Sequence, residues 1–535
     1  VYPEEGSNTA KICYKDIKLE LDRLSGAETP SKTDKLSDGE SYDKNALEIL
    51  VGRTGHAETA EALSKINYGD YIITSIDRKL IITAYSDTSL TLAANAFIEL
   101  VKSSYTDGVL KLGTDIMLTG SESSSLYKPF KEFPKYEGGV FNSVKDAGDG
   151  HSQAIIYKSN KTEFDRYCEG LGENGFELYA SSEMGDNYSK TYLKGERMVH
   201  AYFVSYSGEV RIVTAENVTL PPGDVVGNAK VVEPSFTFFG VEKSGEAGGF
   251  GCMFQFEDGS FFIIDGGYND TKCANDIFGK LYELAPDKNN IIIRGWLITH
   301  AHGDHYGAFR KFAATYGSYK AIKIESFLYN FCNTSEQTQF SDEGKSFYSA
   351  TEFMTKYYPE ATVYKPLTGQ VFRYAGAELE TLYCMSDFLP KVIGYESPDV
   401  EKDKVDGNLQ TLVIRFRIAG QTLMITGDSS KINIDEMSNR YGAYLKSDMM
   451  TVPHHGWNQN RYRARNGTIQ FYTFVDPNVV FWPDGIAAQA KKMKWDGKAG
   501  SDWEANHFLI NSLNVKQCVV AGSTTRTFIL PYTAK

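Results

Sequence analysis

Four side chains that can bind a metal ion lie within six positions of one another, at His300, His302, Asp304 and His305. They directly follow the apolar run 291–298, which predicts a buried strand that ends in this loop. Three of the nine histidines of the chain are in the loop. Imidazole nitrogen and carboxylate oxygen are ligands that zinc takes, and a catalytic zinc keeps one position for water. The pattern therefore indicates a metal-dependent hydrolase.

The spacing within this loop predicts two metal positions. His300 and His302 are two residues apart, so on an extended segment both project to the same side and can hold one ion. Asp304 and His305 are adjacent, so they point apart and can reach a second ion. Two ions about 3.5–4 Å apart can share a hydroxide and hold the attacking and leaving oxygens of a substrate.

Two later segments place further ligands at the ends of expected strands. The run 421–426 reads as a strand and is followed by Gly427-Asp428, where the aspartate can bridge both ions. The run 448–453 reads as another strand and leads into His454-His455-Gly456. A helical stretch is expected between them, around residues 434–445.

Taken together, the motifs resemble the metallo-β-lactamase superfamily. His-Ala-His-Gly-Asp-His at 300–305, Thr-Gly-Asp at 426–428 and Val-Pro-His-His-Gly at 452–456 are most similar to the branch with the C-terminal domain of competence protein ComEC and pneumococcal phosphorylcholine esterase. The segment 261–267 resembles the family's early strand and turn. The resemblance covers 233–535 and implies an αββα sandwich with one or two Zn²⁺ at one edge, two being expected.

The resemblance also implies a role for each ligand. His300, His302 and one of the pair His454/His455 hold the first ion, Asp304 and His305 hold the second, and Asp428 bridges them. The candidate catalytic residues are Asp304, Asp428 and His455. That branch often has one more histidine downstream, and the single later histidine here is His507, near the start of an expected helix.

Candidate substrate contacts follow the histidine pair. Trp457 and Asn458 stand where the branch commonly has serine. Arg461 and Arg463 alternate on an expected loop, and their guanidinium groups suit a phosphate or a carboxylate. Two Zn²⁺ contribute +4 to the centre, whereas two aspartates and a hydroxide contribute −3, so an anionic substrate is favoured.

We therefore expect a zinc-dependent hydrolase that acts on a phosphodiester or a phosphocholine-type ester. Three alternatives stay open at this stage. One is a lactonase or β-lactamase-like hydrolase of C–O or C–N bonds. The second is a nuclease. The third is a cell-surface protein of weak catalytic activity that binds glycan or wall polymer.

Composition limits the partners. A net charge of −13 argues against stable nucleic-acid binding, because phosphate contacts dominate that affinity. The sequence contains no run of about 18 apolar residues, so we predict no membrane span. The seven cysteines are scattered and form no disulfide or zinc framework. The chain opens at Val1 rather than methionine. From this and the resemblance to pneumococcal phosphorylcholine esterase we expect an extracellular or cell-surface location in a bacterium. A small anionic substrate or a surface polymer is the expected partner.

At 535 residues the chain is too long for one core, so several domains are expected. We predict an α/β fold in which two small α+β domains precede the sandwich. From residue 46 to 102 the chain shows a βαββα pattern. Through the segments 49–54, 69–71 and 93–97, this unit resembles the accessory N-terminal domain beside catalytic domains of bacterial glycoside hydrolases. In the second small domain, Thr162 is the expected cap of a helix. The predicted parts are a polar segment (1–45), the βαββα domain (46–145), the second domain (146–220), a linker (221–232) and the hydrolase domain (233–535).

Overall fold

The computed structural model describes residues 1–106, 109–113, 115–131, 133–216, 218, 220, 230–241, 248–330, 343–387, 407–458 and 467–534. Arg461, Arg463 and most of the expected linker lie outside these ranges. The chain forms two compact units. The first contains Val1–Val144 with Ala154–Tyr157 and Glu169–Asn174, and the second contains the rest, up to Lys535.

The first unit contains a sheet with the strand order β1-β3-β2-β6. Its β2–β3 hairpin turns at Asp77, which has a positive φ of 49°. The βαββα pattern expected from the sequence is present in order. The bounds are α1 (Asn8–Ser25), β1 (Glu48–Val51), α2 (Ala57–Ser64), β2 (Asp70–Ile76), β3 (Lys79–Ala84), α3 (Asp87–Ser103), β4 (Tyr105–Thr106), β5 (Val109–Leu110) and β6 (Met117–Ser121).

Helix α1 lies in the polar N-terminal stretch, where the sequence suggested no element. Only Ala10, Cys13 and Ile17 are buried along it, at the i, i+3 and i+7 positions of one face. These residues join the core that α3 also contributes to. The stripe is narrow and two of its residues are small, so the helical period is weak in the sequence.

A second sheet has the strand order β7-β8-β12-β11-β10-β9 and is accompanied by helix α4. The helix begins at Lys161, and Asn160 Oδ1 accepts a hydrogen bond from the backbone N–H of Glu163 at 3.1 Å. Asn160 therefore caps this helix, and the expectation that Thr162 caps it is wrong. The bounds are β7 (Val140–Gly148), β8 (His151–Tyr157), α4 (Lys161–Glu173), β9 (Glu177–Met184), β10 (Asn187–Lys194), β11 (Arg197–Val204) and β12 (Glu209–Ala215).

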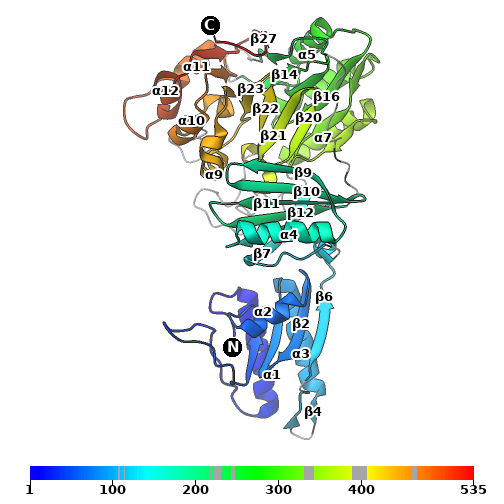
Figure 1. Cartoon of the computed structure of the whole chain (residues 1–535), viewed down its shortest axis with the longest axis vertical. Helices are drawn as coiled ribbons and strands as arrows, with labels where there is room; N and C mark the ends of the chain where they lie inside the picture. The colour runs from blue at the N-terminus through cyan, green and yellow to red at the C-terminus, as the bar shows by residue number, and fades with distance from the viewer. Residues whose placement is uncertain are drawn as a thin grey trace. The chain divides into compact units, whose positions relative to one another are not determined.

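Two larger sheets form the C-terminal part of the second unit (Figure 1). Over the described residues the first has the path β19-β18-β16-β15-β14-β13-β27 with β17 beside β16, and the second runs from β20 to β26 in chain order. The strands of the first are β13 (Ser235–Phe238), β14 (Gly251–Gln255), β15 (Phe261–Asp265), β16 (Ile291–Leu297), β17 (Ile322–Ile324), β18 (Ser326–Leu328), β19 (Thr362–Tyr364) and β27 (Arg526–Ile529). Those of the second are β20 (Val371–Tyr374), β21 (Ala377–Tyr383), β22 (Val413–Ile418), β23 (Gln421–Ile425), β24 (Met449–Thr451), β25 (Val479–Trp482) and β26 (Gln517–Val520).

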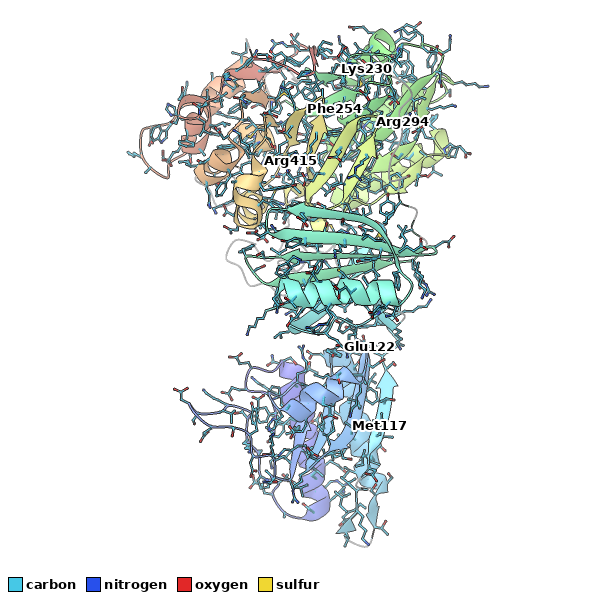
Figure 2. All side chains as sticks on the ribbon, viewed as in Figure 1. Met117, Glu122, Lys230, Phe254, Arg294 and Arg415 are labelled. Atoms are coloured by element: carbon cyan, nitrogen blue, oxygen red, sulfur yellow. The ribbon has the colours of Figure 1, made fainter. Side chains whose placement is uncertain are left out.

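The two sheets pack face to face, and helices cover their outer faces. Along β15, Phe262 and Ile264 enter the core between the sheets, whereas Phe261 and Ile263 face the helical side. Phe254 of β14 stacks on the ring of a phenylalanine of the other sheet, and Figure 2 shows it among the strands. Helices α5 (Thr271–Leu284), α6 (Gly303–Tyr316) and α7 (Glu343–Tyr357) cover the first sheet, and α9 (Lys431–Tyr441), α10 (Ile469–Val475) and α12 (Glu504–Asn511) cover the second. The αββα fold class is thus confirmed.

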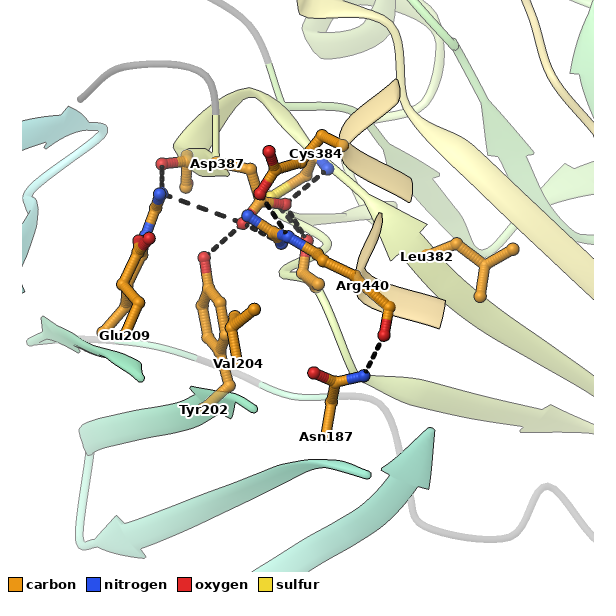
Figure 3. A network of polar contacts seen from close by, with 12 residues as sticks. Asn187, Tyr202, Val204, Glu209, Leu382, Cys384, Asp387 and Arg440 are labelled. Atoms are coloured by element: carbon orange, nitrogen blue, oxygen red, sulfur yellow. Dashed lines mark hydrogen bonds and ion pairs between the residues drawn. The ribbon is translucent and has the colours of Figure 1, made fainter. Parts of the chain in front are cut away.

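A buried polar network joins the six-stranded sheet to the sandwich (Figure 3). Asp387, which lies just after β21, accepts hydrogen bonds from the hydroxyl of Tyr202 on β11 and, at 2.9 Å, from Arg440 at the end of α9. Asn187 Nδ2 donates to the carbonyl of Arg440 at 2.7 Å, and Arg211 Nη1 donates to a neighbouring backbone oxygen at 2.6 Å. These buried charges fix the sheet against the sandwich.

No helix among the described residues combines the length and the apolar character that crossing a bilayer requires.

Removing the charge at the centre of this network should cost stability in a pH-dependent way. Burial alone would raise the pKa of Asp387, but Arg440 and Arg211 outweigh it and lower the pKa to about 2. Because this is below the unfolded value near 4, the stabilisation is fully present above pH 4 and is lost as the pH falls toward 2. Asp387→Asn should lower the free energy of unfolding by about 2 kcal/mol at pH 7 and by about 1 kcal/mol less at pH 3, measured by urea denaturation.

Asp276→Asn is the matched control. Asp276 pairs with Lys272 at 2.7 Å on the outer face of α5, and both side chains are partly exposed. Exposed pairs of this kind contribute roughly 0–1 kcal/mol. An equal loss in both variants, or a loss at Asp387 that does not change with pH, would contradict the assigned role of the network.

Candidate metal centre

The loop after β16 brings the first four predicted ligands to the edge of the first sheet. His302 is the N-cap residue of α6, and Asp304 lies in the first turn of that helix. A carboxylate at this position is stabilised by the helix dipole. His300 and His305 are fully buried, whereas His302 and Asp304 are partly exposed. One face of the group is therefore open to a substrate.

The turn after β23 displays the predicted bridging carboxylate. Gly427 has φ 49°, and a Cβ at this position would lie 2.6 Å from Thr411 Cγ2, so the turn requires glycine. Asp428 follows directly and is buried. Strand β23 runs parallel to β24, so the turns that follow these two strands lie at the same edge of the second sheet.

The histidine pair lies in an unusual turn after β24. His454, His455 and Gly456 have consecutive positive φ values of 45°, 51° and 75°. For a residue with a side chain, such a conformation costs on the order of 1–3 kcal/mol. A Cβ on Gly456 would lie 2.1 Å from the ring of Trp482, so this position also requires glycine. The backbone N–H of His454 donates to the carbonyl of Gly427 at 3.0 Å, which ties the two ligand turns together.

The Asp428 carboxylate is the centre of the arrangement. Its Oδ1 lies 3.2 Å from Nε2 of His305. Its Oδ2 lies 3.3 Å from Nε2 of His455, 3.6 Å from Nε2 of His454 and 3.8 Å from Nε2 of His300. One carboxylate thus faces four imidazoles, which come from two separate segments of the chain.

The ligand atoms form two groups of three. His300, His302 and Asp428 make one group, and Asp304, His305 and His455 make the other. Within each group the ligand atoms lie within 4.8 Å of one another. The sequence left open which histidine of the pair joins the first ion. The structure places His455 with Asp304, at 3.7 Å, and leaves His454 beside Asp428.

The buried nitrogens of these histidines indicate that a cation fits. Nε2 of His300, Nε2 of His305 and both ring nitrogens of His455 are buried and have no hydrogen-bond partner among the described residues. Unpartnered buried polar atoms are costly. Imidazole and carboxylate groups that converge in this way are a donor set suited to Zn²⁺ and to other first-row metals.

Burial and neighbouring charges shift the pKa values of two histidines of the site. Burial lowers the pKa of His300 well below its usual value, and His305 and His302 lower it further. Burial would also lower the pKa of His305, but Asp428, Asp265 and Asp304 raise it well above its usual value. The carboxylates of Asp428 and Asp265 on either side of His305 thus favour a positive charge at this position. A bound cation would supply that charge and leave the imidazole neutral.

Asp265, at the end of β15, is a residue whose role the sequence did not reveal. Its carboxylate accepts hydrogen bonds from the backbone N–H and the hydroxyl of Thr299, at 2.8 and 2.7 Å, and from Nδ1 of His305 at 2.8 Å. Since the hydroxyl donates to Asp265, it accepts from Nδ1 of His300, 3.0 Å away. Asp265 thus orients one histidine of each group with Nε2 toward the centre. The match of 261–267 to a family strand was the signal in the sequence that pointed to this position.

The other residues predicted to bind a metal ion or a substrate lie outside the two ligand groups. His507 is on α12 with its ring 5.0 Å from that of Trp495, and it belongs to neither ligand group. Asn458 is buried, and its amide donates to the carbonyl of Gly467 at 2.9 Å, so that donor is engaged within the protein. Trp457 is partly exposed beside the histidine turn, with the ammonium of Lys492 4.5 Å from its ring centre.

Comparisons with known proteins add little. No protein-family model matches the chain, and no curated protein is similar to it by sequence. The metallo-β-lactamase fold protein YhfI from Bacillus subtilis matches 55% of this chain and 100% of its own, with 10% identity and a TM-score of 0.32. CmlA, a diiron β-hydroxylase from Streptomyces venezuelae, matches 56% of this chain and 54% of its own, with 12% identity and a TM-score of 0.32. Zn²⁺-bound PqqB from Methylobacterium extorquens matches 41% and 71%, with 8% identity and a TM-score of 0.26.

Asp265→Asn should weaken metal binding without unfolding the protein. Asparagine keeps the shape of the side chain but removes the negative charge that accepts from Thr299 and His305. Loss of such an outer partner typically lowers metal affinity by about 10–100-fold. Titration of the metal-free protein with Zn²⁺ against a chromogenic chelator measures the change.

Asp258→Asn provides the comparison, because Asp258 is paired with Arg294 at 2.9 Å and belongs to neither ligand group. This variant should bind Zn²⁺ as the parent does. Equal affinities in the Asp265 and Asp258 variants would show that Asp265 does not orient the ligands.

Proposed function

We propose that the chain is a zinc-dependent hydrolase that uses water activated between two cations, and that its substrate is a phosphodiester or a phosphocholine-type ester. The observation that carries the proposal is the position of Asp428 between two groups of histidine and aspartate ligands. When bound, two divalent cations supply a water that deprotonates near neutral pH and positive charge for the developing oxyanion.

The residues of the chain prepare this chemistry. Asp428 spans the two groups, with one carboxylate oxygen toward His305 and the other toward His300 and His455. Asp265 keeps the Nδ1 protons on the side away from the centre, so the Nε2 lone pairs are free for cations. Burial of His300 and His455 excludes water from the inner side, and the partly exposed His302 and Asp304 mark the face where a substrate enters.

The charge of the centre supports an anionic substrate. Asp304 and Asp428 together with a hydroxide would carry −3, and two divalent cations would carry +4, so the ligands and ions of the centre would retain one positive charge. The chain as a whole has a net charge of −13. A local positive site within a negative protein favours a small anionic ester over a polyanion, and it supports the phosphodiester proposal over the nuclease alternative.

Metal content and turnover test the proposal together. The purified protein should bind about two Zn²⁺ and cleave bis-p-nitrophenyl phosphate. Removal of the metal by a chelator should abolish turnover, and Zn²⁺ should restore it. His302→Ala and Asp428→Asn should each lose metal and lower the rate by at least about 100-fold, because each removes a ligand of the nucleophile-forming centre.

His507→Ala should keep both cations and its activity, because its ring packs on Trp495. Loss of one cation in that variant would identify His507 as a ligand. Turnover of nitrocefin or of lactones by a metal-loaded protein that leaves all phosphodiesters intact would replace the proposed substrate with the lactonase or β-lactamase-like alternative. A protein that binds no transition metal would end the proposal.

A further inference from the structure

The turn that presents His454 and His455 is held from behind by two side chains. The carbonyl of His455 accepts a hydrogen bond from Lys492 Nζ at 2.8 Å. The carbonyl of Gly456 accepts one from Asn506 Nδ2, also at 2.8 Å. Asn506 Nδ2 donates in addition to the carbonyl of Lys492 at 3.0 Å, so the end of α11 (Ile486–Lys492) and the helix α12 are tied to each other and to the turn.

Lys492 is an unusual residue for this position. Its ammonium group is buried and has three neighbours: the carbonyl of His455, the carboxylate of Asp484 at 2.6 Å, and the ring of Trp457 with its centre 4.5 Å away. Asp484 is itself fully buried and accepts from the backbone N–H of Gly248 at 3.0 Å. A buried ammonium needs several partners to be retained, and here one of the partners is the backbone carbonyl of a predicted metal ligand.

The contacts act on the backbone that places the imidazoles. His454 and His455 both have left-handed backbone conformations, which histidine adopts only when its surroundings impose them. Lys492 and Asn506 hold two successive carbonyls, those of His455 and Gly456, in the orientation that these conformations require. If the turn relaxed to ordinary backbone angles, the ring of His455 would leave Asp304 and His305.

We propose that Lys492, with Asp484 and Asn506, is a positioning device for the second cation, the one held by Asp304, His305 and His455. This inference rests on the proposed metal-dependent function. The device touches neither cation nor substrate and acts through the carbonyls of the turn. The first group of ligands also has anchors outside the histidine turn, because His300 is held by Thr299 and Asp428 lies in its own glycine turn. Loss of the device should therefore weaken one of the two cations selectively.

The test compares metal affinities in matched variants. Lys492→Met alone leaves Asp484 buried without its partner, so the main variant combines it with Asp484→Asn and keeps the pair neutral. Lys491→Met is the control, since Lys491 is the exposed neighbour on the same helix. Asn506→Leu removes the other donor. Each metal-free protein is titrated with Zn²⁺ against a chelator, and with Co²⁺ while the visible absorption of each bound ion is followed.

The control should bind two cations as the parent does. The double variant and Asn506→Leu should stay folded, bind the first cation with little change and bind the second about 10–100-fold more weakly. Equal affinity for both cations in the double variant would overturn the inference and leave the proposed function standing. Unfolding of the double variant would also count against it, because the pair would then hold the fold rather than the turn. A parent protein that binds no cation would overturn both proposals.

Discussion

One buried carboxylate organises the candidate centre. Asp428 faces four imidazoles at 3.2–3.8 Å, two from the loop after β16 and two from the turn after β24. An isolated carboxylate would be expensive to bury, and burial alone would raise the pKa of Asp428. His305, His455 and His454 outweigh that effect and lower it well below its usual value. The position thus favours a charged carboxylate among imidazoles whose protons a bound cation can displace.

The sandwich explains how turns so distant in the chain meet. Strands β15 and β16 are parallel neighbours in one sheet, and β23 and β24 are parallel neighbours in the other. The turns after parallel neighbours gather at one edge, and the face-to-face packing of the sheets joins the two edges. Close approach then requires small residues, and Gly427 and Gly456 each stand where a Cβ would collide with a neighbouring side chain.

The parts of this arrangement that rest on local patterns could be predicted from the sequence. The apolar runs before residues 300, 427 and 454 are strands, and the fold class followed from motifs at their ends. Other features depend on contacts that no local pattern contains. Asp265 meets His305 across 40 positions, and Arg440 meets Asp387 across 53. Which histidine of the 454–455 pair faces which group depends on two left-handed backbone conformations, which residue spacing does not encode.

Helix α9 links the centre to the buried polar network. The helix starts three residues after Asp428, where Asn433 Oδ1 accepts hydrogen bonds from the N–H and hydroxyl of Ser430 at 3.1 and 2.6 Å. Near its other end, Arg440 pairs with Asp387 and accepts at its carbonyl from Asn187 of the six-stranded sheet. Apolar side chains could form this contact between α9 and the six-stranded sheet at a lower desolvation cost. They would allow the helix to shift along the sheet, whereas directional hydrogen bonds between charged groups define one orientation. The six-stranded sheet is therefore part of the framework that holds α9, and with it the turn that presents Asp428.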